Sequence, residues 1–318
     1  APTIFWLFVG RIFSGITGAS ITTASAYIAD ISDDSNRSKN FGMIGAAFGL
    51  GFIIGPVIGG LLGQFGSRVP FYAAAVLCLV NFAYGYFILP ESLGKEHRRP
   101  FEWKRANPVG SLLKVRTHPE ILKLFIAWFL VYLASHAVQT NWAYFTMYKF
   151  AWDEKTVGIS LGVMGAFTAF VQGFLIRKVH PKLGSERSIL YGIMFYCTGM
   201  LLFAFAQKEW MMYAILAIYC LGGIAGPALQ SVISSKVSPK EQGDLQGALT
   251  SVISITSIIG PLLMTQIFYF FTHPDAKIKL LTLELKPPFQ FSGAPFFLGF
   301  VLMAVSAYFV YYVFHRKK

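Results

Sequence analysis

A glycine-rich apolar segment, residues 45–63, limits what this chain can fold into more than any other stretch of its sequence. It lies within an uncharged run, residues 41–66, which is long enough for one helix to cross the hydrocarbon core of a bilayer. The glycines at every fourth position share one face of such a helix: Gly51, Gly55, Gly59 and Gly63. A small-residue face lets a second helix approach closely in lipid, so we expect it to pack against another helix. Pro56 should bend its own helix, because proline removes a backbone donor.

This glycine–proline pattern occurs twice. Gly42 precedes Gly55-Pro56 by 13 residues, and Gly247 precedes Gly260-Pro261 by the same 13 residues, 205 positions later. The flanking segments recur in the same order: a glycine cluster before each copy, at 15–19 and 223–228, and a proline–aromatic segment after each copy, at 70–72 and 295–297. The last pair is 225 positions apart, so the extra 20 residues are expected in the loop 272–294. Parallel repeats of several membrane helices are typical of transporters, whose substrate path lies at the repeat interface.

The composition indicates an integral membrane protein. Apolar residues make up 55% of the chain and charged residues only 13%, whereas soluble domains carry about 25% charged residues. The sequence predicts an all-α membrane bundle with nine spanning helices, because nine apolar segments are long enough to cross a bilayer. These segments are 4–28, 41–63, 69–89, 121–145, 157–176, 188–206, 211–234, 247–271 and 296–314.

The net charge of +12 is explained by topology rather than by nucleic-acid binding. Eighteen lysines and arginines fall in one set of connections between the expected helices, and seven fall in the alternate set. The richer side should be cytoplasmic, which places the C-terminus inside the cell. We therefore expect a multi-pass protein of the inner (cell) membrane with a cytoplasmic C-terminus and no nucleic-acid partner.

A polar connection, residues 90–119, divides the expected helices into a block of three and a block of six. We expect residues 1–89 to hold the last three helices of an N-terminal half, and 120–318 to form a six-helix C-terminal half. If the repeat unit is six helices, nine of twelve helices are present and three precede residue 1. The chain is then a fragment, which fits its start at the edge of an apolar segment.

No enzyme motif, cofactor motif or metal-ligand spacing occurs in the sequence, and the three cysteines lie within apolar runs. Polar residues inside the expected membrane helices are better candidates, because burial in lipid is costly without a role or a partner. The candidate substrate-binding residues are Arg11, His136, Gln139, Asn141, Trp142, Thr168, Gln172, Tyr196 and Gln230. Each could instead form an interhelical hydrogen bond, and Arg11 could extend to the lipid headgroups. As a set facing one cavity, they would suit a large amphipathic solute.

The acidic residues carry a second expectation. All fifteen fall in predicted loops or at helix ends, so no visible helix holds a buried carboxylate of the kind a proton relay uses. If transport is coupled to protons, the titrating acid lies in helices that are not visible here, or the candidate is His136, whose imidazole can change charge near physiological pH.

Short motifs follow one another in a recognisable order along the chain. They include Gly10-Arg11-Ile12, Gly15-Ile16-Thr17-Gly18-Ala19, Ala26-Tyr27-Ile28-Ala29-Asp30-Ile31, Arg37, Phe41-Gly42, Gly55-Pro56 with Gly59-Gly60, Leu89-Pro90-Glu91-Ser92, Pro227-Ala228-Leu229-Gln230, Gln242-Gly243 and Gly260-Pro261-Leu262-Leu263. With this series, the chain resembles the major facilitator superfamily and, within it, the tetracycline-resistance type of drug/H+ antiporters. The resemblance extends from that family's fourth helix to its twelfth.

The resemblance implies a fold of two pseudo-symmetric halves that exports drug in exchange for protons by alternating access. It implies gating or structural roles for Asp30 and Arg37, as an acid–base pair, and for Gly51, Gly55, Pro56, Gly59, Gly260 and Pro261. Arg11 takes the place of the family's arginine in the fourth helix. Tyr196 stands where the family has an acid in the ninth helix, Thr168 where it has a histidine, and His136 where it has a glutamine. The visible wall then bears no negative charge, which favours neutral or weakly charged amphipathic compounds over a metal–tetracycline chelate.

Two other classes of function remain open at the level of sequence. One is a facilitative or uptake carrier for an endogenous small solute, and the other is a receptor or scaffold that is derived from this fold and carries no flux. The expected partners are a small amphipathic substrate, protons and the lipid bilayer, and we expect a monomer without a cofactor.

Overall fold

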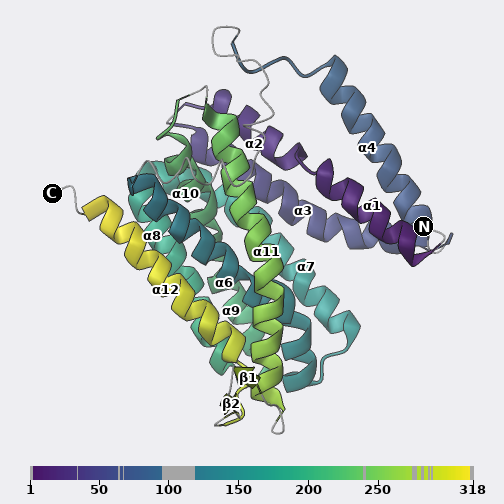
Figure 1. Ribbon diagram of the computed structural model, residues 1–318, viewed down its shortest axis with the longest axis vertical. Coiled ribbons are helices and arrows are strands. Elements are labelled where there is room, and N and C mark those ends of the chain that lie inside the picture. Colours follow the sequence, from purple (N-terminus) through teal and green to yellow (C-terminus); the bar gives the residue numbers. More distant parts are fainter. Residues whose placement is uncertain are drawn as a thin grey trace.

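The computed structural model describes residues 3–33, 35–63, 65–66, 68–94, 119–238, 241–273, 278–280, 283–285, 287 and 289–315. The first helices, which we call the N-terminal unit, are α1 (Ile4–Ile16), α2 (Ser20–Asp30), α3 (Arg37–Gly63) and α4 (Val69–Phe87). The remaining elements, the C-terminal unit, are α6 (Pro119–Phe150), α7 (Glu154–Phe170), the π-helix η2 (Val171–Leu175), α8 (Ile176–Phe205), α9 (Glu209–Leu221), the 3₁₀-helix η3 (Gly222–Ile224), α10 (Ala225–Ser234), α11 (Gln242–Thr272) and α12 (Ala294–His315). Figure 1 shows α4 along one side of the bundle and α12 along the opposite side.

The described chain confirms the expected all-helical membrane fold, apart from one short hairpin. Strands β1 (Ile278–Leu280) and β2 (Leu283–Leu285) pair antiparallel between α11 and α12. This is where the repeat predicts its additional residues. Much of the connection 90–119, from Lys95 to His118, lies outside the described residues, so the predicted division at this linker stays a prediction.

Seven segments of the described chain are long and apolar enough to cross a membrane. One of them, Thr156–Phe205, has 50 residues, which exceeds the length of a single crossing. It contains a break at Gly184, whose φ of 74° lies in the left-handed region that glycine adopts without strain. The expected number of nine spanning helices therefore stays a prediction.

The repeat also governs where helices begin. Helices α1, α2 and α3 start at residues 4, 20 and 37, and α9, α10 and α11 start at 209, 225 and 242, each 205 positions later. Helices α4 and α12 start at 69 and 294, which are 225 positions apart. The offsets taken from the two glycine–proline motifs thus apply to four pairs of helices.

Two helices that the sequence predicts as continuous, 4–28 and 211–234, are interrupted. A turn at Thr17–Ala19 separates α1 from α2, and η3 separates α9 from α10, again 205 positions later. Glycine destabilises a regular helix interior, and each break lies at a glycine cluster. At Gly222 the glycine also makes room for a neighbour, because a Cβ there would lie 2.5 Å from Cγ of Tyr196.

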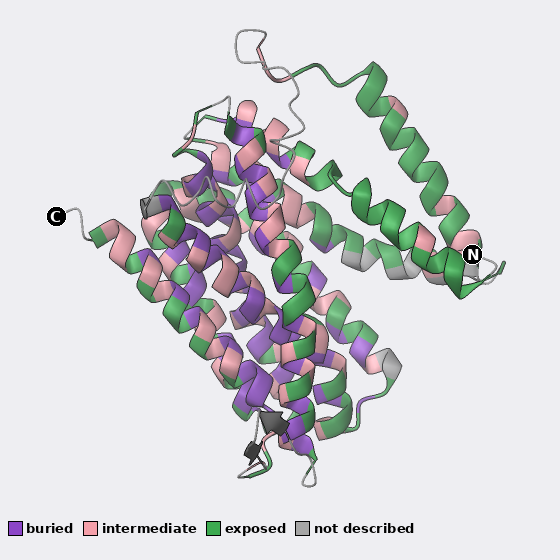
Figure 2. Cartoon of the chain, viewed as in Figure 1, coloured by how far each residue is buried: buried purple, intermediate pink, exposed green. Residues whose placement is uncertain are grey.

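The core of the bundle lies in the C-terminal unit. The largest side chains without exposure include Phe145 of α6, Met200 and Phe203 of α8, and Phe296 of α12. The ring of Phe296 lies 4.9 Å from that of Phe145, edge to face. By contrast, α1 and α4 contain no buried residue and appear as exposed ribbons in Figure 2.

Candidate functional site

The second glycine–proline motif is a contact between α6 and α11. A Cβ at Gly260 would lie 2.5 Å from Cγ and 2.8 Å from Cβ of His136, so the imidazole fills the space that the glycine leaves open. His136 is only 8% exposed. The structure therefore places this sequence-predicted residue in a helix seam of the C-terminal unit, directly on a predicted structural glycine.

The first glycine–proline motif has different surroundings in the described chain. Within the described chain, nothing lies within 4 Å of a Cβ built at Gly51, Gly55 or Gly59. The described residues therefore do not show the expected close packing of this face, and the packing stays a prediction. The side chain of Pro56 lies outside the described residues.

A different glycine face of α3 forms the close contact. At Gly49, a Cβ would lie 2.8 Å from the backbone nitrogen of Ala169 and 2.9 Å from the carbonyl oxygen of Gly165, both in α7. At Gly42, it would lie 2.9 Å from the carbonyl oxygen of Gln172 in η2. Helix α3 crosses α7 and η2 along its Gly42–Gly49 part, so these glycines are in close contact and Gly51, Gly55 and Gly59 are not. The glycine spacing 42, 45, 49 is a signal that sequence reasoning missed.

Gln172 joins three elements at this crossing. Its side-chain amide occupies the position that a Cβ on Gly45 would take, and its Nε2 lies 3.2 Å from a Cβ position on Gly223 of η3. Gln172 was expected to bind substrate. In this structure it instead fills slots at the contact between the N-terminal unit and the two non-α segments of the C-terminal unit.

A side-chain hydrogen bond joins the two units on the other side. Thr22 Oγ1 of α2 donates to Thr250 Oγ1 of α11 at 2.9 Å. This hydrogen bond crosses from the N-terminal to the C-terminal unit. Under the repeat, the α2–α11 contact corresponds to the contact of α10 with α3, which the structure also contains. The units therefore meet through two seams, one where α3 crosses α7, η2 and α10 and one where α2 meets α11, which we call the inter-unit seams.

Tyr196 and Thr168, which stand where the family has an acid and a histidine, both lie near η3. The ring of Tyr196 lies 4.8 Å from that of Tyr219 and packs on Gly222. Thr168 Oγ1 donates to the carbonyl oxygen of Met164 at 2.8 Å and lies 3.9 Å from Cys220 Sγ. Both side chains are half-buried, and no carboxylate is among their contacts in the described chain.

The other candidates do not form a single cavity wall. Trp142 is buried and donates from Nε1 to Ser160 Oγ at 2.8 Å, and Asn141 is buried with both amide atoms lacking a hydrogen-bond partner among the described residues. Gln139 and Arg11 are exposed, and Gln139 donates to Ser135 at 3.1 Å. The expectation that these residues face one cavity as a set is not met in this structure, because positions two apart, such as Gln139 and Asn141, point to different sides of α6.

Glutamines connect α10 to α11. Gln230 Nε2 donates to Gln246 Oε1 at 2.9 Å, and Ser234 Oγ donates to Gln242 Oε1 at 2.8 Å. Gln242 returns a hydrogen bond from Nε2 to the Ser234 carbonyl at 2.8 Å. Gln230, a candidate for substrate binding, thus takes part in an interhelical hydrogen bond, which is the alternative that the sequence left open.

The turn between α2 and α3 has its own polar network. Asp30 Oδ2 accepts a hydrogen bond from Ser92 Oγ at 2.9 Å, and Arg37 Nη2 donates to the carbonyl of Ser32 at 3.1 Å. The acid–base pairing of Asp30 with Arg37 stays a prediction. Within the same turn, Asp33 Oδ1 accepts from the backbone nitrogen and the hydroxyl of Ser35 at 2.9 and 2.6 Å.

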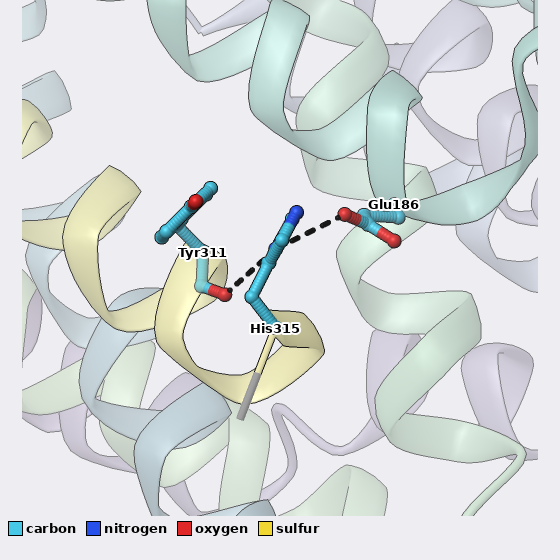
Figure 3. Close-up of polar contacts among 3 residues, drawn as sticks. All are labelled: Glu186, Tyr311 and His315. Atoms are coloured by element: carbon cyan, nitrogen blue, oxygen red, sulfur yellow. Dashed lines mark hydrogen bonds and ion pairs between the residues drawn. The ribbon is translucent and has the colours of Figure 1, made fainter. Parts of the chain in front are cut away.

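An ion-pair contact lies at the far end of α12. His315 Nδ1 lies 3.4 Å from Glu186 Oε1 and 3.2 Å from the carbonyl oxygen of Tyr311 (Figure 3). The imidazole also stacks on the ring of Tyr311 at 4.0 Å. Because both neighbours are acceptors, Nδ1 carries the hydrogen in this arrangement. No cluster of three or more His, Cys, Asp or Glu side chains that could hold a metal ion occurs in the described part of the chain.

These features define a multi-pass membrane protein built from two related sets of helices that meet along seams of small residues. The family model of the Major Facilitator Superfamily matches residues 1–261 and, in a second match, 124–317. The chain belongs to the major facilitator superfamily, a family of transporters.

Individual relatives agree with this assignment. The chain is 39% identical over 267 residues to the class C tetracycline resistance protein of Escherichia coli. The matched region covers 84% of this chain and 67% of that protein. It is 36% identical over 268 residues to the class G protein of Vibrio anguillarum, with coverage of 84% and 68%. The chain thus spans about two thirds of the length of these curated relatives. The human organic anion transporter MFSD10 has a similar fold, with a TM-score of 0.80, 21% identity and coverage of 95% of this chain and 70% of that one.

Proposed function

We propose that this protein exports amphipathic drugs in exchange for protons by alternating access. The observation that carries the proposal is the identity of 36–39% along 84% of the chain to tetracycline resistance proteins. Drug efflux is what such a relationship favours, and tetracycline itself is one possible substrate.

The inter-unit seams support the alternating-access part of the proposal. A transporter must exchange two arrangements of its units that differ by only a few kcal/mol. Glycine contacts at Gly42, Gly45 and Gly49 and the hydrogen bond between Thr22 and Thr250 bring the units close. Small residues let two helices pack closely without interlocked side chains, so such contacts can separate and re-form.

The residues near η3 support a substrate of low charge. Tyr196 and Thr168 supply hydroxyl groups and rings but no negative charge. A cationic metal–tetracycline chelate would lack an opposite charge here, and a unit charge pair about 4 Å apart is worth about 4 kcal/mol at an effective dielectric constant near 20. We therefore propose that neutral or weakly charged amphipathic compounds are preferred.

We also propose an orientation and a coupling residue. The excess of basic residues in one set of connections supports a cytoplasmic C-terminus in the inner membrane, and we propose a monomer. His136 is the buried titratable side chain of α6, so it is the candidate for proton coupling within the visible helices.

Drug accumulation inside inverted membrane vesicles, which corresponds to efflux from the cell, tests the function, measured with and without an imposed pH gradient and with and without Mg²⁺. We expect saturable, gradient-driven efflux of weakly charged amphiphiles that does not need Mg²⁺, and His136→Gln should change its dependence on pH between about 6 and 8. Tyr196→Asp should increase any efflux of the Mg²⁺–tetracycline chelate. Strong Mg²⁺-dependent tetracycline efflux by the unmodified protein would contradict the charge argument, and efflux that is indifferent to the gradient would favour a facilitative carrier.

A further inference from the structure

A cavity of about 840 Å³ lies away from the seams, where α6 ends and α9 begins. The residues that line it are Tyr148, Lys149, Phe150, Ala151, Gln207, Lys208, Glu209, Trp210 and Tyr213. They combine four aromatic rings with two lysines and one glutamate. The cavity is shallow and largely open to its surroundings, so it suits one end of an elongated molecule better than a ligand enclosed on all sides.

The backbone fixes the floor of this cavity. Ala151 has a φ of 54°, an uncommon value for a residue other than glycine, and closes α6 by donating to the carbonyl oxygen of Met147 at 3.1 Å. The next residue, Trp152, is buried, and its ring lies 5.5 Å from that of Tyr213 in α9. The turn therefore anchors the end of α6 to α9, and the lining residues are held on regular elements.

The two lysines of this cavity lack an acidic partner. Lys149 is half-buried, and its Nζ lies 5.4 Å from the ring centre of Phe145 and 6.0 Å from that of Phe150. Within the described chain, neither Lys149 nor Lys208 has a carboxylate oxygen within 4.0 Å, and this includes the carboxylate of Glu209. Lys149 is half-buried and Lys208 is exposed, so both ammonium groups can pair with an anion that binds in the cavity.

The cavity also lies at the level of the membrane surface. One apolar span ends at Phe150 and another begins at Glu209, so the lining residues sit where two spans leave the hydrocarbon core. Aromatic rings and lysines at this level meet lipid headgroups. An amphiphile that reaches this site therefore presents its headgroup to the lysines and its chains to the rings.

We propose that this cavity binds the phosphodiester headgroup of an anionic phospholipid. The ammonium groups of Lys149 and Lys208 pair with the phosphate oxygens, as lysines do in other phosphate sites. The rings of Tyr148 and Trp210, which are both exposed, flank the glycerol and the start of the acyl chains. Glu209 leaves the cavity with one net positive charge, which matches a single phosphodiester rather than a group of higher charge. The site is separate from the inter-unit seams and does not depend on the proposed transport.

Native mass spectrometry of the purified protein, titrated with phosphatidylglycerol and with phosphatidylcholine, tests the proposal. We expect one phosphatidylglycerol to bind more tightly than phosphatidylcholine. Lys149→Gln and Lys208→Gln should each weaken that binding by about fivefold, since a basic residue near the membrane surface attracts anionic lipid by this amount. Lys178→Gln is the matched control, because Lys178 lies 4.5 Å over the ring of Phe174 at a different site and should leave this binding unchanged.

Further variants separate charge from folding and lipid from free phosphate. Lys149→Arg with Lys208→Arg should retain binding, and it stands in for the glutamine variants if they do not fold. Inorganic phosphate at millimolar concentration should not displace the lipid, because it lacks the chains that contact the rings. The proposal is overturned if both lysine variants bind phosphatidylglycerol as the unmodified protein does, if Lys178→Gln loses as much, or if inorganic phosphate alone occupies the site.

Discussion

The imidazole of His136 lies in the space above Gly260, where any larger residue would overlap its ring. The equivalent glycine of the first repeat, Gly55, has nothing within 4 Å in the described chain. Two copies of one motif therefore have different packing roles, and substitutions at the two positions should give opposite results.

Gly260→Ala should destabilise the protein by about 1–2 kcal/mol. Overpacking a tight contact costs about 1–3 kcal/mol, and the gain in helix propensity from glycine to alanine offsets up to about 1 kcal/mol of that. Gly55→Ala is the matched control and should be neutral or stabilising, because only the propensity gain applies. Denaturation in mixed micelles, followed by circular dichroism, measures both. Equal losses at the two positions would mean that the Gly55 face is packed in the membrane.

Gly49→Ala should separate α3 from α7. The new methyl group would meet backbone atoms of Ala169 and Gly165 at 2.8–2.9 Å, and a backbone cannot move aside as a side chain can. We expect at least a tenfold loss of drug efflux, while Gly51→Ala, with nothing within 4 Å, should retain it. Rates in vesicles, normalised to the amount of inserted protein, provide the comparison. Normal efflux by Gly49→Ala would show that this seam does not need close contact.

Thr22→Val should weaken the closed seam between α2 and α11. Valine keeps the shape but removes the hydroxyl that donates to Thr250, and a hydrogen bond of this kind contributes about 1 kcal/mol. The ratio of closed to open arrangements should fall about fivefold, as measured by distances between spin labels on the two units. Thr250→Val should have the same effect, and the double variant should lose no more than either single one, because both remove the same bond. Additive losses would contradict a direct contact.

The turn at Asp33 should respond to acid. The hydroxyl of Ser35, followed by the backbone N–H groups of Asn36 and Ser35 and the charge of Arg37, holds the pKa of Asp33 below its usual value of 3.8. The folded turn favours the carboxylate, so its contribution is complete above about pH 4 and is lost as the pH falls through the lowered pKa. Hydrogen exchange of the Ser35 and Asn36 amides, corrected for intrinsic rates, should show protection at pH 5 that falls below pH 3. Asp33→Ala should lack that protection at both values, and protection unaffected by pH in the unmodified protein would contradict the prediction.

Sequence spacing predicted the repeat well, because insertions and helix starts obey chain distance. The offset between Gly42 and Gly247 extends to helix boundaries that no motif marks. Spacing could not decide which glycine face of α3 meets a neighbour, since both the Gly42–Gly49 and the Gly51–Gly59 sets repeat with helical spacing. That choice depends on where α3 crosses α7, which is a property of the packed bundle.

The candidate site was harder to predict for a related reason. Hydropathy treats Asn141, Trp142 and Gln139 alike as polar or aromatic positions within one span, whereas their directions around α6 separate buried from exposed. The breaks at Thr17–Ala19 and at η3 were missed because hydropathy stays high across them. Thr22 gave no sequence signal at all, since its partner Thr250 is 228 residues away and neither residue belongs to a motif.

The constant offset between the helix starts also records the history of the chain. From the start of α1 to the start of α3, and from the start of α9 to the start of α11, the two copies have kept the same length since they diverged. All of the difference in length between the matched helices lies between α11 and α12, where the hairpin β1–β2 is found. This connection therefore tolerates additional residues, and an epitope or a reporter is best inserted there.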